Sequence, residues 1–240
     1  IYFITFKLNK FKQNTSFIFQ NHEDQLEFLK AGYIGANNAT VIGHFGVTQV
    51  NAEDAQKESA DFIKFFFAGR LLKSKGVIEL VEATKYLAKK HSNFQTIIAG
   101  PECLDSPDHL TASERKLFET SSFIKYIGHI DYEDMYSLYQ KFDVFVLPSY
   151  REGLSTVCLE AAANGMPLIV SDVPGCSDCF NDNGFLVKPK DISGLANAME
   201  QFILNPSLIH GFSKNSYEHV RLNYSPKKMA KAYLDLMKKN

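Results

Sequence analysis

From residue 62 onward, short apolar runs alternate with longer segments whose apolar residues follow a helical spacing. The apolar runs cover residues 62–68, 94–99, 123–127, 142–147, 167–171 and 184–187, and the helical segments cover 76–90, 111–120, 131–141, 154–164 and 192–204. Runs that are apolar throughout are typical of strands buried on both faces. Strands that alternate with helices predict βαβ units, and hence an α/β fold with a parallel sheet covered by helices on both faces.

Charge and composition exclude several classes of protein. The 240 residues hold 26 Lys and Arg against 27 Asp and Glu, a net charge of −1, so nucleic acid is not an expected partner. A chain that is 45% hydrophobic and 22% charged is expected to be globular. We find no apolar run of the roughly 18 residues that a membrane-spanning helix needs.

The four cysteines predict neither a disulfide framework nor a metal centre. They are Cys103, Cys158, Cys176 and Cys179. Four thiols in a chain of this length are too sparse for a disulfide scaffold, which favours reduced thiols and a cytoplasmic location. The last two form a Cys-X-X-Cys pair, but no second pair or histidine set follows at the spacing of a zinc site.

Two polar loops follow predicted strands, where an open parallel sheet binds its ligands. The first loop, residues 69–76, reads Gly-Arg-Leu-Leu-Lys-Ser-Lys-Gly. Its glycines allow a close backbone approach, and Arg70 and Lys75 suit a diphosphate, although a solvated basic loop is the alternative. The spacing matches neither a Walker A loop nor a Gly-X-Gly-X-X-Gly turn, which argues against a dehydrogenase.

The second loop precedes a predicted helix and carries two acidic residues. Glu152 lies just before the helix and Glu160 two turns within it, so both carboxylates can border one cleft. The amino end of a helix after Gly153 is also a favourable anion site. The alternative is that Glu152 only caps the helix and Glu160 is an ordinary exposed residue. The apolar neighbours of Glu160 favour a functional acid, since an unpaired carboxylate is costly there.

Taken together, these segments resemble a known family over about residues 40–240. The matching segments are 69–71, 75–76, 97–100, 148–153 with Glu160, 171–176 and 183–189. They resemble the nucleotide-sugar half of a family 4 glycosyltransferase with the GT-B fold. The resemblance implies a Rossmann-like carboxyl-terminal domain that binds the donor. A sugar-nucleotide epimerase of related fold fits the Glu152 and Glu160 segment less well.

The resemblance also implies roles for individual residues. Arg70 and Lys75 would hold the donor diphosphate, and Glu152 would contact hydroxyls of the donor sugar; these three form the expected catalytic set. Glu160 would bind the ribose hydroxyls, amides from residues 153–155 would meet the phosphates, and segments near 100–101 and 126–129 would frame the base. The expected donor-binding residues are Gly69, Gly100, His129, Gly153, Leu154, Ser155, Thr156 and Glu160.

Such enzymes usually retain the configuration of the sugar and need no divalent metal or other cofactor. The sequence holds no Asp-X-Asp triplet, which agrees with a cationic clamp on the diphosphate. A glycosidase, with Glu152 and Glu160 as acid and nucleophile, is the tempting alternative. We reject it because a diphosphate leaves without strong acid assistance.

The family carries an acceptor-binding domain before the donor domain, and little of it precedes residue 49 here. We expect a remnant of that domain and the crossing segment at 1–48, the donor domain at 49–225, and a helix packing back toward the first domain at 226–240. The crossing reads Gly46-Val47-Thr48 in place of the usual Gly-Val-Asp. The chain is therefore expected to be truncated, and a nucleotide-sugar-binding module that is inactive without a partner is the alternative function.

At a finer level, the sequences of residues 17–21, 150–152 and 173–176 resemble those of transferases that build capsule, O-antigen or other lipid-linked glycans. The expected donor is a UDP-linked hexose or N-acetylhexosamine, and the expected acceptor is lipid-linked or a polysaccharide. A lysine cluster at 227–239 would either rest on anionic lipid or form a solvated face. The expected location is the cytoplasm or the inner face of its membrane.

Overall fold

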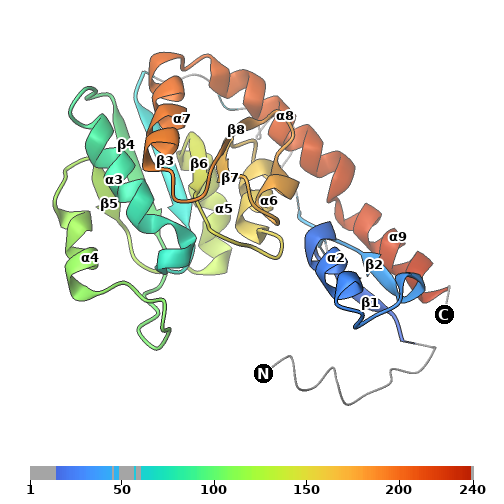
Figure 1. Cartoon of the computed structure of the whole chain (residues 1–240). Helices are drawn as coiled ribbons and strands as arrows, with labels where there is room; N and C mark the ends of the chain where they lie inside the picture. The colour runs from blue at the N-terminus through green and yellow to red at the C-terminus, as the bar shows by residue number, and fades with distance from the viewer. Residues whose placement is uncertain (1–14, 45, 49–56, 58–60, 239–240) are drawn as a thin grey trace.

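The computed structural model describes residues 15–44, 46–48, 57 and 61–238, and its main part is a six-stranded parallel sheet (Figure 1). The strands are β3 (Ile63–Ala68), β4 (Phe94–Ala99), β5 (Ile124–Tyr126), β6 (Val144–Leu147), β7 (Leu168–Ser171) and β8 (Gly184–Val187). They lie in the order β5-β4-β3-β6-β7-β8, and every neighbouring pair is parallel. The predicted α/β fold class is confirmed.

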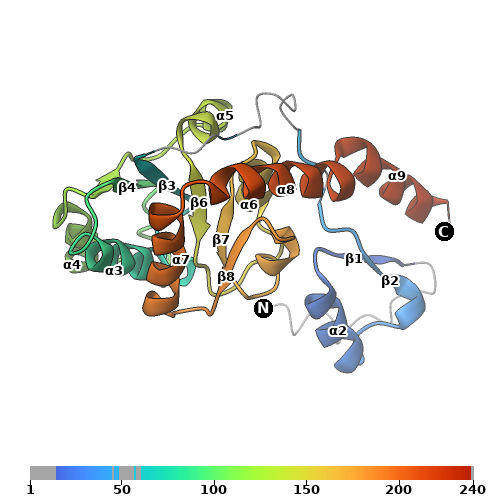
Figure 2. The same cartoon turned by 90° about the horizontal axis from the view of Figure 1, so that it is seen from above.

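Helices cover both faces of this sheet. The helices in this part of the chain are α3 (Val77–Leu87), α4 (Ala112–Lys116), α5 (Tyr132–Lys141), α6 (Thr156–Ala163), α7 (Ile192–Leu204) and α8 (Leu208–Asn223), and α9 (Pro226–Met237) continues beyond the sheet. Helix α3 packs against α7 on one face, and α6 packs against α8 on the other (Figures 1 and 2). Within the described ranges, we find no helix that is both long and apolar enough to cross a membrane.

Several helix boundaries differ from the sequence-based expectation. Helix α3, predicted at 76–90, ends at Leu87, and the other differences include two with a clear physical cause. The predicted helix 154–164 begins at Thr156, because the Ser155 hydroxyl accepts a hydrogen bond from the Cys158 amide and caps the helix there. The predicted helix 111–120 begins with a capping box between Thr111 and Glu114. It then tightens into a 3-10 turn at Leu117–Glu119.

The core of the sheet is aromatic. Phe65, Phe66 and Phe67 of β3 are fully buried. The Phe65 ring contacts Phe94 of β4 at 6.1 Å between centroids, and the Phe66 ring contacts Phe145 of β6 at the same separation. Burying each such ring contributes roughly 1.5–3 kcal/mol, so β3 is held rigidly at the centre of the sheet.

The direction of the strand order reverses at β3. From β3 the chain moves outward through β4 and β5, and then returns to place β6 on the other side of β3 before continuing to β7 and β8. In an open parallel sheet such a reversal leaves a crevice at the carboxyl ends of the two central strands. The loops that follow β3 and β6 are the two polar loops singled out from the sequence.

A smaller unit precedes the sheet. Strands β1 (Phe17–Phe19) and β2 (Ala39–Val41) pair in parallel and are linked by α2 (His22–Lys30). We call residues 17–41, which hold these three elements, the first unit. The crossing segment follows β2; its Phe45 lies outside the described residues, as do residues 49–56 on the predicted domain boundary. Helix α9 extends from the sheet toward the side where the first unit lies (Figures 1 and 2).

Candidate functional site

Glycines bring the loops at the carboxyl edge of the sheet into backbone contact. Gly76 has a φ of +69°, and a Cβ there would overlap the carbonyl oxygen of Pro148. Gly100 has a φ of +143°, and its Cβ would overlap the carbonyl oxygen of Gly69. Side chains are disfavoured in this region of backbone space and have no room here. The loops after β3, β4 and β6 therefore form one tightly joined rim.

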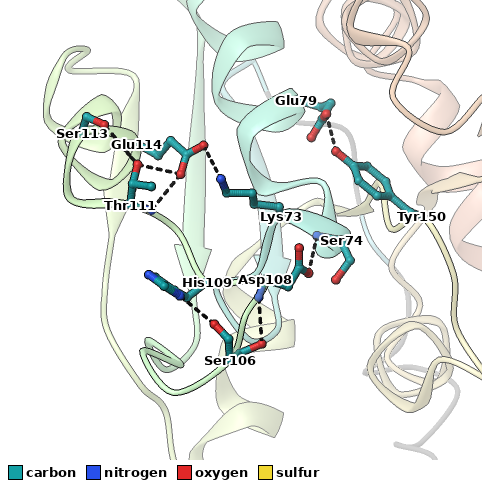
Figure 3. A network of polar contacts seen from close by, with 10 residues as sticks. All are labelled: Lys73, Ser74, Glu79, Ser106, Asp108, His109, Thr111, Ser113, Glu114 and Tyr150. Atoms are coloured by element: carbon teal, nitrogen blue, oxygen red, sulfur yellow. Dashed lines mark hydrogen bonds and ion pairs between the residues drawn. The ribbon is translucent and has the colours of Figure 1, made fainter.

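Polar contacts fix the loop after β3 on both sides (Figure 3). The Ser74 amide donates to the Asp108 carboxylate at 2.9 Å, and the Ser74 carbonyl accepts from the Tyr150 amide at 2.8 Å. The hydroxyl of Tyr150 donates to Glu79 at 2.6 Å. These bonds hold the backbone that carries Lys75 between the loops that follow β4 and β6.

Lys75 and Glu152, which were predicted to meet the diphosphate and the sugar, are brought together. The Lys75 Nζ lies 2.5 Å from Glu152 Oε1, and the two side chains are only 18% and 13% exposed. The Ser149 hydroxyl donates to the same carboxylate oxygen at 2.8 Å. Two donors on one oxygen, in a partly desolvated setting, fix the carboxylate in a single orientation.

Arg70 lies on a neighbouring cavity of about 330 Å³ that several other predicted site residues share. Its walls include Gly69, Arg70, Gly100, His129, Thr156 and Glu160. Arg70 is exposed, and among the described residues no ion pair of its guanidinium is found. The His129 side chain is 63% exposed and lies 3.6 Å from the Asp131 carboxylate. This cavity therefore carries a guanidinium and a carboxylate on its wall.

Glu160 is half-buried, and a tyrosine supports it. The Tyr139 hydroxyl donates to Glu160 Oε2 at 2.9 Å. Burial raises the pKa of the Glu160 carboxyl, and the hydrogen bond from Tyr139 counteracts part of that rise. The Tyr139 ring is 2% exposed and packs edge-on against Phe66 and Phe145. The acid is thus held at a fixed place on the cavity wall.

The predicted amide cradle at residues 153–155 is only partly free in this structure. The Ser155 amide donates to the Gly175 carbonyl at 2.9 Å, and the side chains of Leu154 and Ser155 are buried. Thr156, the first residue of α6, is exposed on the cavity. The amino end of α6 consequently faces the cavity through Thr156 rather than through the amide of Ser155.

A second cavity of about 370 Å³ adjoins the first and shares Thr156 and Glu160 with it. The crossing segment forms its far wall, where His44 Nε2 lies 3.1 Å from the Thr156 hydroxyl. The Gly46 amide donates to His44 Nδ1, so Nε2 carries the proton of the neutral ring. Burial lowers the pKa of His44, which favours that neutral form.

Tyr139 and His44 were missed by the sequence reasoning. Tyr139 lies on the helix before β6 with no adjacent polar motif, and His44 shares no regular spacing with the other histidines of the sequence. The only available signal for Tyr139 was a polar aromatic on the buried side of a predicted helix.

Three of the four cysteines are buried thiols. Cys158, Cys176 and Cys179 are buried, and burial raises the pKa of the Cys158 and Cys176 thiols. In the parts of the chain that the structure describes, no group of three His, Cys, Asp or Glu side chains could hold a metal ion.

Comparison with known proteins identifies a family for this arrangement. The model of the family described as glycosyl transferases group 1 matches residues 49–219, which include both loops and the whole six-stranded sheet. The capsular polysaccharide biosynthesis glycosyltransferase CapM of Staphylococcus aureus is 29% identical over 161 residues, 66% of this chain and 41% of that protein.

A second relative extends the similarity across the first unit. The N,N'-diacetylbacillosaminyl-diphospho-undecaprenol alpha-1,3-N-acetylgalactosaminyltransferase of Campylobacter jejuni is 29% identical over 240 residues, 94% of this chain. The chain spans 61% of that protein, and so covers only part of the length of either relative.

Solved structures share the fold. A glycosyltransferase from Rickettsia africae superposes with a TM-score of 0.81 at 20% identity, over 99% of this chain and 66% of its own. HepE of Anabaena, solved in complex with UDP and glucose, has a TM-score of 0.79 at 19% identity, over 94% of this chain and 63% of its own. With the family model covering most of the chain, the protein belongs to the glycosyl transferases of group 1 and carries the GT-B type of Rossmann-like domain.

Proposed function

We propose that this chain binds a UDP-linked hexose or N-acetylhexosamine and forms the donor half of a retaining, metal-independent glycosyltransferase. The acceptor of the complete enzyme is a lipid-linked glycan or a polysaccharide. The reaction takes place in the cytoplasm or at the inner face of its membrane.

One observation carries the proposal: Arg70 and Glu160, 90 positions apart, face one cavity at the crevice between β3 and β6. A nucleoside diphosphate offers an anionic diphosphate and a ribose with two hydroxyl groups. A guanidinium matches the first through paired N–H donors. A carboxylate accepts hydrogen bonds from the second. The apolar wall formed by Pro101, Ile130 and Met135 suits a planar base.

Lys75 and Glu152 extend this site toward the sugar. An ammonium has three donors, so Lys75 can keep its contact with Glu152 and also donate to a phosphate oxygen. The bond between the anomeric carbon and the phosphate oxygen breaks, and its electron pair moves onto the leaving diphosphate. The cations Arg70 and Lys75 stabilise that charge. The acceptor oxygen bonds to the same face of the carbon, and its proton passes to the leaving diphosphate.

The choice of UDP and of acceptor class draws support from the relatives. HepE was solved with UDP and glucose, and the Campylobacter jejuni protein is named for transfer to an undecaprenol-linked sugar. The cationic residues of the loop after β3, together with the absence of an Asp-X-Asp triplet, support a diphosphate clamp that needs no metal.

Calorimetric titration of the chain with UDP and with UDP-N-acetylglucosamine tests the proposal. Arg70→Ala and Glu160→Ala should each weaken UDP binding by about 1–3 kcal/mol. Arg221→Ala, which breaks an exposed ion pair with Glu218 on α8, is the matched control and should leave binding unchanged. Wild-type protein that folds but binds no UDP would refute the donor assignment.

Turnover separates the enzyme from the binding module. Release of UDP that depends on an added undecaprenol-linked glycan indicates transfer. Binding of the UDP-sugar without such release indicates a module that needs a partner.

A further inference from the structure

The first unit makes direct polar contact with the loop that carries Glu152. Asn21 lies between β1 and α2, is only 2% exposed, and donates from Nδ2 to the Gly153 carbonyl at 2.6 Å. The two residues are 132 positions apart in the sequence. A hydrogen bond of this span, donated by a buried side chain, fixes the separation between the two parts of the protein at the edge of the candidate site.

Arg151, which precedes Glu152 in the sequence, also contacts the first unit. Arg151 Nη2 lies 2.6 Å from Asp24 Oδ1 and 3.5 Å from Glu27 Oε2. The Arg151 side chain is 65% exposed, so this pair contributes less than the buried bond of Asn21. Contacts from α2 and its cap therefore reach the residues immediately before and after Glu152.

The backbone at Glu152 and Gly153 is also enclosed sterically. A Cβ on Gly153 would overlap the side-chain oxygen of Gln20, which belongs to the first unit. A Cβ on Gly175 would lie 2.6 Å from the Glu152 carbonyl oxygen. The two residues are thus packed between the first unit and the loop after β7. Their backbone is enclosed, whereas the side chain of Glu152 extends to Lys75.

We infer that Asn21, assisted by Asp24, is a positioning residue that holds the Glu152 carboxylate in place for the sugar of the donor. This inference rests on the proposed function, and it assigns to the first unit a role in recognising the donor sugar as distinct from the nucleotide. The nucleotide contacts at Arg70 and Glu160 lie on other elements and do not touch Asn21.

The capping role of Asn21 can be separated from the contact with Gly153 by one substitution. The Asn21 Oδ1 accepts from the Asp24 amide at 2.8 Å and caps α2. An aspartate caps a helix as well as an asparagine does, but it has no N–H to donate. Asn21→Asp therefore keeps the cap acceptor and removes both bonds that Nδ2 donates, the one to the Gly153 carbonyl and the one to the Asp24 carboxylate at 2.9 Å. Asp191→Asn, a reciprocal change at the cap of α7, is the matched control.

Two measurements on the 240-residue chain test the inference. Hydrogen exchange should be faster across residues 150–156 in Asn21→Asp and unchanged elsewhere in the sheet. The ratio of the dissociation constants for UDP and UDP-N-acetylglucosamine, which reports the contribution of the sugar, should fall about three- to tenfold. The affinity for UDP itself should change less than twofold. Arg151→Gln should show a smaller effect in the same direction.

Each other outcome overturns the inference in a distinguishable way. Unchanged exchange at 150–156 would show that Asn21 does not hold the loop, whatever the ligand result. Faster exchange with an unchanged ratio would remove the role toward the sugar and leave the proposed function standing. Wild-type protein that binds neither ligand would refute the proposed function, and the sugar-positioning role with it.

Discussion

Replacing Tyr139 with phenylalanine removes one hydroxyl from the site and tests how Glu160 is supported. The Tyr139 hydroxyl donates to Glu160 Oε2 at 2.9 Å, and the ring remains enclosed by Phe66 and Phe145 after the change. A hydrogen bond to a charged group contributes about 1.5–3 kcal/mol. Because Glu160 is half-buried, water can replace part of the lost bond, and we expect a loss in the free energy of unfolding of about 1.5 kcal/mol at pH 7.

The pH dependence of that loss follows from the pKa of Glu160. Burial raises the pKa of Glu160 in the folded state, so the charged carboxylate reduces stability once the pH exceeds the unfolded value of about 4.3. The Tyr139 bond opposes this rise in pKa, and the phenylalanine variant should have a still higher folded pKa. The loss of stability should therefore be complete above the folded pKa and small below about pH 4.

Urea unfolding at pH 4 and pH 7 provides the assay, and Tyr126→Phe is the matched control. The Tyr126 hydroxyl donates to the Gly100 carbonyl at 2.9 Å, a neutral acceptor on the same rim. Its loss should cost about 1 kcal/mol at both pH values. If the Tyr139 variant loses the same free energy at pH 4 as at pH 7, the hydroxyl does not stabilise an ionised Glu160 and the reasoning fails.

Two further predictions concern the backbone of the site and the end of α5. Gly76→Ala should destabilise the protein by about 2 kcal/mol or more in urea unfolding, since its φ of +69° and the Pro148 carbonyl leave no place for a Cβ. Gly211→Ala on α8, where the space around the Cβ is open, should stabilise the protein by about 0.5–1 kcal/mol. Equal effects of the two substitutions would contradict the steric argument. Lys57 donates hydrogen bonds to carbonyls at the end of α5, and burial lowers its pKa to about 8. Between pH 8 and 10.5 the unfolded state therefore binds more protons than the folded state. The stability of the wild type should rise with pH across that window. Lys57→Met should lack that rise in unfolding experiments between pH 7.5 and 10, and parallel curves for the two proteins would refute it.

The fold could be predicted because its signals are local and repeated. Strands β4 and β8 and helix α7 have the bounds expected from the sequence, since each is an apolar or periodic run closed by glycine, proline or a polar cap. The parallel sheet followed from the alternation alone. The start of α6 was placed two residues early, although Ser155 is a good capping residue and carried the necessary signal.

Site residues could be predicted only where a short segment of sequence contains both the strand and the polar residues that follow it. Arg70, Lys75, Glu152 and Glu160 each lie in a segment whose position after a strand is readable from the sequence. The contacts of Tyr139, His44 and Asn21 depend on how separate elements are oriented. Their hydrogen bonds join residues 21, 112 and 132 positions apart, and such separations produce no periodic pattern in the sequence. Sequence reasoning therefore selected polar groups that the structure places on the candidate site, and it missed those that hold them in position.

The contacts divide the site into two parts that should respond differently to movement of the first unit. Arg70 and Glu160 are anchored on β3, α5 and α6 within the six-stranded sheet, and their geometry does not depend on Asn21. Glu152 is joined to Lys75 of the sheet domain, while its neighbours in the chain are joined to the first unit. A displacement of the first unit would therefore disturb the Glu152 carboxylate before it disturbed Arg70 and Glu160, the residues proposed to contact the nucleotide. In a two-domain transferase this arrangement would make tight binding of the sugar, but not of the nucleotide, conditional on the closed position of the domains.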